Sequence, residues 1–165
     1  KIMRKIFYLV ILSVVSINLI SCGGAKKMVE TPPQYNRNIE NQFDKNTNYI
    51  NANEWMVNTF NSAKSVIQFS DKENGIIKGK YLLKQRQVSG GAYSIEMNPD
   101  FYAIITIRVK DNKTRIEIDP PSGMFTQVSM GYEYGFTPKM FDDRAKKLSD
   151  DFEKQMKKGI SDGDF

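Results

Sequence analysis

Residues 102–119, YAIITIRVKDNKTRIEID, constrain the fold more than any other part of the chain. Apolar residues occupy every second position from Ala103 to Val109, and the alternation returns at Ile116 and Ile118. Such alternation is typical of strands that bury one face, and a short polar segment between two of them favours an antiparallel hairpin. The segment therefore predicts two paired strands with one apolar face and one polar face.

The register of this hairpin is predicted by matching its apolar faces, because directly opposed residues lie on the same side of a sheet. We expect Asn112-Lys113 to form a two-residue turn, or to be the centre of a four-residue loop over the same pairing. The predicted pairs are Ile107 with Ile118, Val109 with Ile116 and, on the other face, Arg108 with Glu117.

A second hairpin is predicted over residues 66–84, VIQFSDKENGIIKGKYLLK. Its turn, ENG, ends at Gly75, which can adopt the left-handed conformation that a short hairpin loop requires. Gly79 in the second strand indicates a bend or a bulge. Residues 92–97 are a further candidate strand, whereas residues 120–137 are expected to be irregular chain that wraps the sheet edge. The predicted buried face consists of Ile67, Phe69, Ile77, Tyr81 and Leu83.

Two helices are predicted by apolar residues that recur at spacings of three and four. The first covers residues 47–63, and Trp55, beside its apolar stripe, is expected to fill the core. The second begins after Thr137, whose side chain can cap it; Pro138 suits its first position, and Gly159 suits its end. The two stripes are Tyr49, Ala52, Met56, Phe60 and Ala63, and then Phe141, Ala145, Leu148, Phe152 and Met156.

The outer surface of the second helix is rich in both acidic and basic residues, in an order that suits the helix dipole. Opposite charges four residues apart on a helix can pair. The predicted pairs are Asp142 with Lys146, Asp143 with Lys147, Asp150 with Lys154 and Glu153 with Lys157. We therefore expect a solvated, self-neutralising surface here rather than a binding site.

The order of these elements is helix, hairpin, the candidate strand at residues 92–97, hairpin, helix. Helices that bracket an antiparallel meander pack on one face of the sheet, so the sequence predicts an α+β fold with both helices on one face. The opposite face of the sheet is then left open to solvent.

The N-terminus has the anatomy of a secretory signal. The basic segment KIMRK precedes the apolar run of residues 6–20, and Ser21 and Cys22 follow it. The stretch LISC resembles the bacterial lipobox, which implies a signal peptide over residues 1–21 and a diacylglyceryl group on the Cys22 thiol. The alternative is an uncleaved anchor with a free or buried cysteine. Because no acidic residue stands next to Cys22, we expect an outer-membrane anchor that faces the periplasm, with surface exposure left open.

Residues 22–46 are predicted to be the lipidated cysteine and a flexible linker, because they are rich in asparagine and poor in large apolar residues. The alternative is that Ile39 and Phe43 begin a first strand. The folded domain is then expected over residues 47–160, followed by a disordered tail at residues 161–165.

The composition argues against most catalytic chemistry. The chain has no histidine, which is the commonest general base and metal ligand, and its single cysteine leaves no internal disulfide.

The formal net charge is +5, but without the three cations ahead of Cys22 it becomes 21 basic against 19 acidic residues, or +2. Such a small excess gives little long-range attraction for an anionic partner. We expect no cofactor, no metal and no enzymatic activity; a carboxylate-dependent hydrolase of the cell envelope is the alternative.

Two segments, EWMVNTFNSAKSVIQFSDKENGIIKGKYLL (54–83) and ITIRVKDNKTRIEI (105–118), resemble a family of bacterial lipoprotein domains of unknown function with a TBP-like fold. The shared features are a tryptophan on a helix that ends in an aromatic residue, an IIKGK strand and a VKD hairpin. The resemblance covers residues 47–158 and implies a curved antiparallel sheet with two helices on one side. It implies no catalytic residue and no known ligand. The TBP label concerns shape only, and nucleic acid is not an expected partner.

The open face of the predicted sheet is the remaining candidate site. Its expected outward residues that carry no positive charge are Gln68, Ser70, Thr106 and Glu117. Its cations are Lys78, Lys80, Arg108, Lys110 and Arg115. One interpretation is a shallow site for an anionic partner, such as a lipid head group, a phosphorylated glycan or an acidic envelope protein. The other is an ordinary solvated face, on which lysines also deter aggregation. The sequence thus predicts a lipid-anchored, non-enzymatic binding module of the cell envelope.

Overall fold

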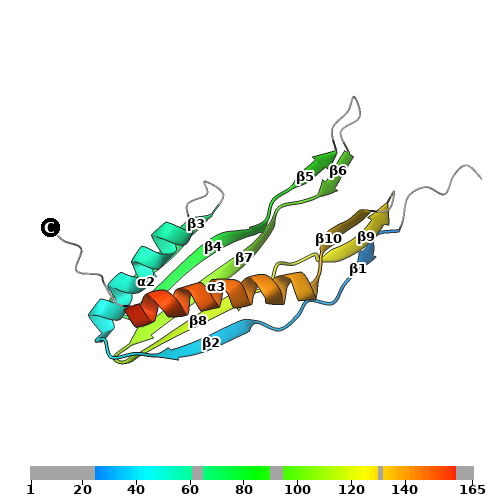
Figure 1. The fold of residues 1–165 in the computed structure, drawn as a ribbon. Helices are drawn as coiled ribbons and strands as arrows, with labels where there is room; N and C mark the ends of the chain where they lie inside the picture. Colours follow the sequence, from blue (N-terminus) through cyan, green and yellow to red (C-terminus); the bar gives the residue numbers. More distant parts are fainter. Residues whose placement is uncertain (1–24, 61–64, 90–94, 130–131, 159–165) are drawn as a thin grey trace, which may run out of the picture.

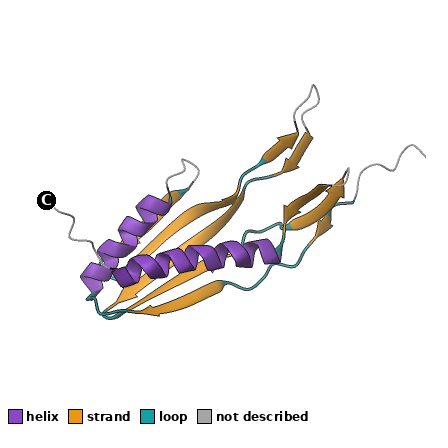
Figure 2. Ribbon diagram, viewed as in Figure 1, coloured by secondary structure: helices purple, strands orange, loops and turns teal. Residues whose placement is uncertain are grey.

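The structure, a computed structural model, describes residues 25–60, 65–89, 95–129 and 132–158. Its main sheet has five antiparallel strands, and two helices, α2 (Lys45–Thr59) and α3 (Pro138–Lys158), cover one face of it (Figure 1). The strands run in the spatial order β2 (Tyr35–Glu40), β8 (Lys113–Asp119), β7 (Phe101–Lys110), β4 (Ile76–Lys84) and β3 (Val66–Asp71). Figure 2 shows the helices and the strands as separate layers, which confirms the predicted α+β fold with both helices on one face.

Two smaller sheets extend the molecule beyond the N-terminal end of α3 (Figure 1). One pairs β5 (Gln87–Ser89) with β6 (Ile95–Asn98), so a strand does lie in the region that the sequence marked as a candidate. The other has the order β1 (Lys27–Met28), β9 (Phe125–Ser129) and β10 (Tyr132–Phe136).

The prediction that residues 120–137 are irregular is therefore wrong, because most of them form the β9–β10 hairpin. The glycine at position 135, which looks like a loop residue in the sequence, stands inside β10. Its φ is 110°, and a Cβ there would lie 1.9 Å from the carbonyl oxygen of Phe125. Close approach of two backbones, rather than a loop, requires this glycine.

The core lies between the main sheet and the helices, and it confirms the predicted strand face. Ala103, Ile105 and Ile107 are 0% exposed, as are Ile116 and Ile118 on the neighbouring strand. They meet the buried apolar residues of the helices, which are Tyr49, Ala52, Trp55 and Met56 on α2, Phe60 directly after it, and Phe141, Ala145, Leu148, Phe152 and Met156 on α3. Both predicted helical stripes are thus confirmed within the described residues; Ala63 lies outside them.

The predicted register of the β7–β8 hairpin is wrong by two residues. The observed pairs are Ile105 with Ile118, Ile107 with Ile116, Arg108 with Arg115 and Val109 with Thr114. A shift of two residues keeps every side chain on its face, so the apolar pattern could not distinguish the two registers. The turn decides between them: Asn112 has a φ of 58°, a conformation that asparagine tolerates. The turn is therefore Asp111-Asn112, between Lys110 and Lys113.

The β3–β4 hairpin has the predicted turn, with Gly75 at a φ of 65°, but its edge strand differs from the prediction. The register shifts between Ile67 and Phe69, so a bulge lies in β3, opposite Gly79 rather than at it. As a result Phe69 pairs with Lys78 and faces away from the helices, whereas the Ser70 hydroxyl hydrogen-bonds that of Tyr49 on α2. Phe69 was predicted to face inward and Ser70 outward, and both predictions are wrong because a bulge exchanges the two faces.

The prediction of a flexible linker over residues 22–46 is wrong for its C-terminal part. Residues 35–40 form β2, an edge strand whose Ile39 is 2% exposed. The open alternative of a strand with Ile39 and Phe43 is therefore observed in part: Ile39 lies in β2, which ends at Glu40, so Phe43 lies outside the strand. Arg37 ties this strand to α3: it donates to Asp150 at 2.6 Å and to Glu153 at 3.1 Å. The signal peptide, Cys22 and the tail lie outside the described residues.

Helix α2 begins two residues before its predicted start. The Asp44 carboxylate accepts a hydrogen bond from the Thr47 backbone N–H at 2.7 Å, which is an N-cap. The same hydrogen bond lowers the pKa of Asp44. The helix ends at Thr59, and the Phe60 N–H closes it onto the Met56 carbonyl. The end of the asparagine-rich segment that was predicted to be linker thus forms the first turn of α2. It is helical because Asp44 caps it and the helix packs on the sheet.

Helix α3 begins at Pro138, after the predicted cap: the Thr137 hydroxyl accepts from the Met140 N–H at 3.3 Å. Of the four predicted ion pairs, the structure confirms Glu153 with Lys157. The other observed pairs on the helix are Lys139 with Asp143 and Lys146 with Asp150. Hydrogen bonds from Lys146 and Arg37 lower the pKa of Asp150, and one from Lys157 lowers that of Glu153.

Candidate functional site

The face of the main sheet opposite the helices carries all five cations that the sequence singled out. Strand pairing places Lys78 beside Thr106 and Lys80 beside Ile104, and the remaining three follow from the alternation along β7 and β8. We call this surface the outer face. Lys78, Arg108 and Lys110 are exposed, whereas Lys80 and Arg115 are half-buried.

Two of these cations are partly neutralised. Arg108 and Arg115 lie directly opposite each other, and Glu117 approaches both, at 3.4 Å and 3.1 Å respectively. The carboxylate offsets the repulsion of two like charges on neighbouring strands. The sequence predicted one pair, Arg108 with Glu117, and the corrected register replaces it with a triad. The charge available to a partner is therefore concentrated on β4 and the end of β7.

The lysines of the outer face have a different setting. The Lys80 ammonium lies 4.0 Å from the centre of the Tyr102 ring, a cation–π contact. Within the described residues, Lys78 and Lys110 have no acidic side chain within ion-pair distance. A hollow of about 410 Å³ lies beside Lys80, and it is bordered by Asp100, Phe101, Tyr102, Ile104, Pro120, Pro121 and Ser122.

Exposed apolar side chains share this face, and sequence reasoning missed one of them. Phe69 is 51% exposed and Val66 is 47% exposed, and they pair with Lys78 and Lys80 respectively. Phe69 was assigned to the core because the bulge that turns it outward leaves no clear signal in VIQFS. The outer face therefore combines positive charge with aromatic and aliphatic surface.

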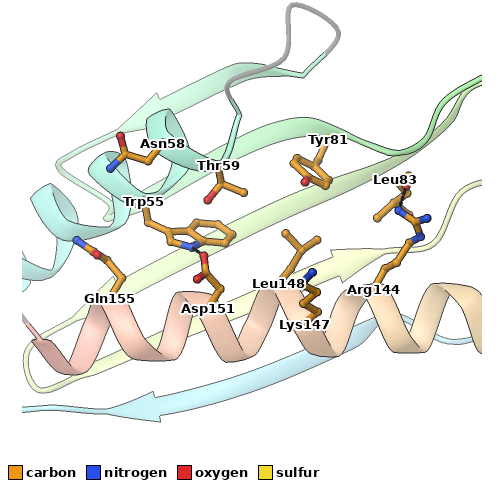
Figure 3. A pocket seen from close by; sticks show the side chains of 10 residues that line it. All are labelled: Trp55, Asn58, Thr59, Tyr81, Leu83, Arg144, Lys147, Leu148, Asp151 and Gln155. Carbon is orange, nitrogen blue, oxygen red and sulfur yellow. Dashed lines mark hydrogen bonds between the residues drawn. The ribbon is translucent and has the colours of Figure 1, made fainter.

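A second candidate site is a groove of about 500 Å³ between the two helices (Figure 3). We call it the interhelical groove. Its floor consists of Trp55 from α2, Tyr81 and Leu83 from β4, and Leu148 from α3. Its rim is polar and consists of Asn58, Thr59, Arg144, Lys147, Asp151 and Gln155. The sequence could not predict this groove, because its residues come from three elements that only the tertiary fold brings together.

Hydrogen bonds fix the two ends of the groove. At one end the Trp55 Nε1–H donates to Asp151 Oδ2 at 2.9 Å, and the indole packs edge-on against Phe152. At the other end the Arg144 guanidinium donates to the Leu83 carbonyl, as Figure 3 shows. Burial and the nearby Arg144 charge lower the pKa of Lys84, the next residue of β4. Arg144 places a positive charge at this end of the groove.

Neither site has the residues of a metal centre. In residues 25–60, 65–89, 95–129 and 132–158, no group of three histidine, cysteine or acidic side chains could hold a metal ion. No helix in this part of the chain combines the length and the apolar character of a membrane span.

Comparison with known proteins identifies the fold family but no activity. A family model described as a domain of unknown function (DUF4468) with a TBP-like fold matches residues 38–122, more than half of the chain. A crystal structure of a protein of this family from Bacteroides ovatus is similar at 15% identity and a TM-score of 0.40, over 73% of this chain and 83% of that one. No curated protein sequence matches significantly. The sheet with two helices on one face and the match over residues 38–122 lead to one conclusion: the chain belongs to the DUF4468 family of domains of unknown function with a TBP-like fold.

Proposed function

We propose that this protein is a lipid-anchored binding module of the cell envelope, and that it holds an anionic partner on the outer face of its main sheet. The observation that carries the proposal is the grouping of Lys78, Lys80 and Lys110 on the outer face, beside exposed Val66 and Phe69. Charge on such a surface attracts an anion, and adjacent apolar surface adds contact area once the partner is bound.

The anchor part of the proposal is supported by LISC at residues 19–22 and the signal-like segment before it. Several acyl chains are needed for stable anchoring, because one chain alone gives only marginal membrane binding. We expect the protein extracted from membranes to begin at Cys22 and to carry the mass of a diacylglyceryl group there. Intact-mass and peptide mass spectrometry measure this directly. An unmodified Cys22 thiol in the membrane fraction would refute the anchor.

The binding part of the proposal predicts a charge-specific loss. We expect the triple variant Lys78→Gln, Lys80→Gln, Lys110→Gln to elute from immobilised heparin, a probe anionic glycan, at clearly lower salt than the parent protein. These three lysines lack a carboxylate partner in the part of the chain that the structure describes, so their removal breaks no ion pair. Elution salt is the suitable measurement because ionic contacts at a surface are screened by salt.

The matched control removes the same charge from the other side of the molecule. The variant Lys139→Gln, Lys146→Gln, Lys157→Gln lies on α3, where each lysine already pairs with an acidic residue. Its elution should stay close to that of the parent. If the two triple variants shift equally, binding depends on net charge alone and the outer face is not the site.

A further inference from the structure

We propose that the interhelical groove is a binding site for a small amphipathic anion, with a carboxylate or similar monoanionic head and an apolar body. This site is separate from the outer face, since the main sheet lies between them. Its volume of about 500 Å³ is within the usual range of small-molecule sites, about 300–1,000 Å³.

The floor of the groove supplies the apolar part of the site. Trp55, Leu83 and Leu148 are 3%, 2% and 9% exposed, and the half-buried Tyr81 ring completes the floor. These side chains are held by the core beneath them, so the surface that they present is preformed. An apolar body that covers this floor removes its remaining exposed area from water.

The rim supplies the charge. Arg144 and Lys147 form no ion pair within the described residues: Asp143 pairs with Lys139, Asp150 pairs with Lys146, and Asp151 accepts from the Trp55 indole. The pair that the sequence predicted for Lys147, with Asp143, is thus absent, and its ammonium is available. Arg144 is oriented by its hydrogen bond to the Leu83 carbonyl. Arg144 therefore borders the floor at one end and Lys147 lies between it and Asp151 (Figure 3). A planar guanidinium is well suited to a carboxylate.

The negative charge of the groove lies at a distance from Arg144 and closer to Lys147. Asp151 is seven positions after Arg144, which is about 10 Å along an α-helix, and four positions after Lys147, which is about 6 Å. The Trp55 indole N–H holds the Asp151 carboxylate. An anionic head bound at Arg144 and Lys147 would place its body over Tyr81, Leu148 and Trp55. A cationic head of the same shape would be repelled at that end, so the groove should discriminate by charge.

The experiment uses the only tryptophan in the chain, Trp55, as an internal reporter of the groove. The purified protein is titrated with 4-phenylbutyrate and, separately, with 4-phenylbutylamine, which has a similar body and the opposite charge. We expect a saturable change in Trp55 emission with the anion and at least tenfold weaker binding of the cation. Equal binding of the two, or a change that never saturates, would overturn the proposal.

Variants locate the site. Arg144→Gln with Lys147→Gln should weaken 4-phenylbutyrate binding by tenfold or more, whereas Lys154→Gln with Lys158→Gln, an equal loss of charge on the same helix, should leave it unchanged. Asp151→Asn keeps an acceptor for the Trp55 N–H but removes the carboxylate, so it should strengthen anion binding. Equal effects of the two double variants would refute the assignment.

Two further measurements keep the test decisive. Far-UV circular dichroism checks that each variant is folded, and the single variant Lys147→Gln, at an exposed position, replaces the double variant if that one fails to fold. The triple lysine variant of the outer face should bind 4-phenylbutyrate as the parent does. Failure of the groove proposal is therefore distinguishable from failure of the proposed function.

Discussion

Replacing Gly135 by alanine is expected to lower the free energy of unfolding by about 3–5 kcal/mol, a large part of the stability of a domain this size. The φ of 110° at this position is one that side chains rarely adopt, and such strain costs about 1–3 kcal/mol. The added Cβ would also lie 1.9 Å from the Phe125 carbonyl oxygen and 2.8 Å from its carbonyl carbon. Because both atoms belong to the backbone of the paired strand, relief requires β9 and β10 to separate.

Gly123→Ala is the matched control for this substitution. Gly123 also has a positive φ, 69°, but a Cβ there would meet nothing within 4 Å. It should therefore cost only the backbone strain, about 1 kcal/mol. Urea unfolding followed by circular dichroism measures both variants. If the two substitutions cost the same, the close contact between β9 and β10 is not what requires Gly135.

Replacing Trp55 by alanine is expected to cost about 3–5 kcal/mol, the usual range for truncating a large buried aromatic residue. Trp55 is 3% exposed and packs edge-on against Phe152 with the ring centres 4.9 Å apart. Its truncation would leave a cavity between α2 and α3 and would open the floor of the interhelical groove. The Asp151 carboxylate would also lose its hydrogen bond from the indole.

Trp55→Phe separates these contributions. Phenylalanine retains most of the ring contact with Phe152 but cannot donate to Asp151, so we expect a loss of about 1–2 kcal/mol. Because neither variant has a tryptophan, unfolding is followed by far-UV circular dichroism. A Trp55→Ala variant as stable as the parent would show that the helix pair does not depend on this residue.

The sequence predicted the elements of the main domain well where each pattern was long and periodic. The stripe from Phe141 to Met156 and the cap at Thr137 predicted α3 to its first residue. The alternation from Ala103 to Val109 predicted the buried face of β7. In both cases one element carries its whole signal locally, because burial of one face imposes the period of that element.

The wrong predictions concern segments in which no long local pattern sets the structure. The linker prediction failed at β2 because the inward positions of this edge strand are Tyr35, Arg37 and Ile39, and the central arginine interrupts the apolar alternation. The 120–137 prediction failed because Gly135 serves a close strand contact rather than a turn. The predicted pair of Lys146 with Asp142 is wrong because Lys146 pairs with Asp150 instead. The Asp150 carboxylate also pairs with Arg37 from β2. The outcomes at Gly135 and Asp150 depend on contacts with another element, which a local pattern does not reveal.

The candidate sites, too, could be predicted from the sequence only in part. Alternation alone was enough to place Lys78, Lys80, Arg108, Lys110 and Arg115 on one face of the sheet. The register and the bulge, however, determined that Glu117 approaches two arginines and that Phe69 lies beside Lys78. The interhelical groove had no signal in the sequence, because Trp55 and Asp151 are 96 positions apart.

By itself, the sequence determined the type of most elements and which side of each is buried, since side-chain direction repeats every two residues in a strand and every 3.6 in a helix. Only the tertiary structure decided which residues meet across elements. A register shift of two residues or a single bulge leaves composition and most of the periodicity unchanged, yet it changes every cross-strand contact. Both candidate binding surfaces of this protein consist of such contacts.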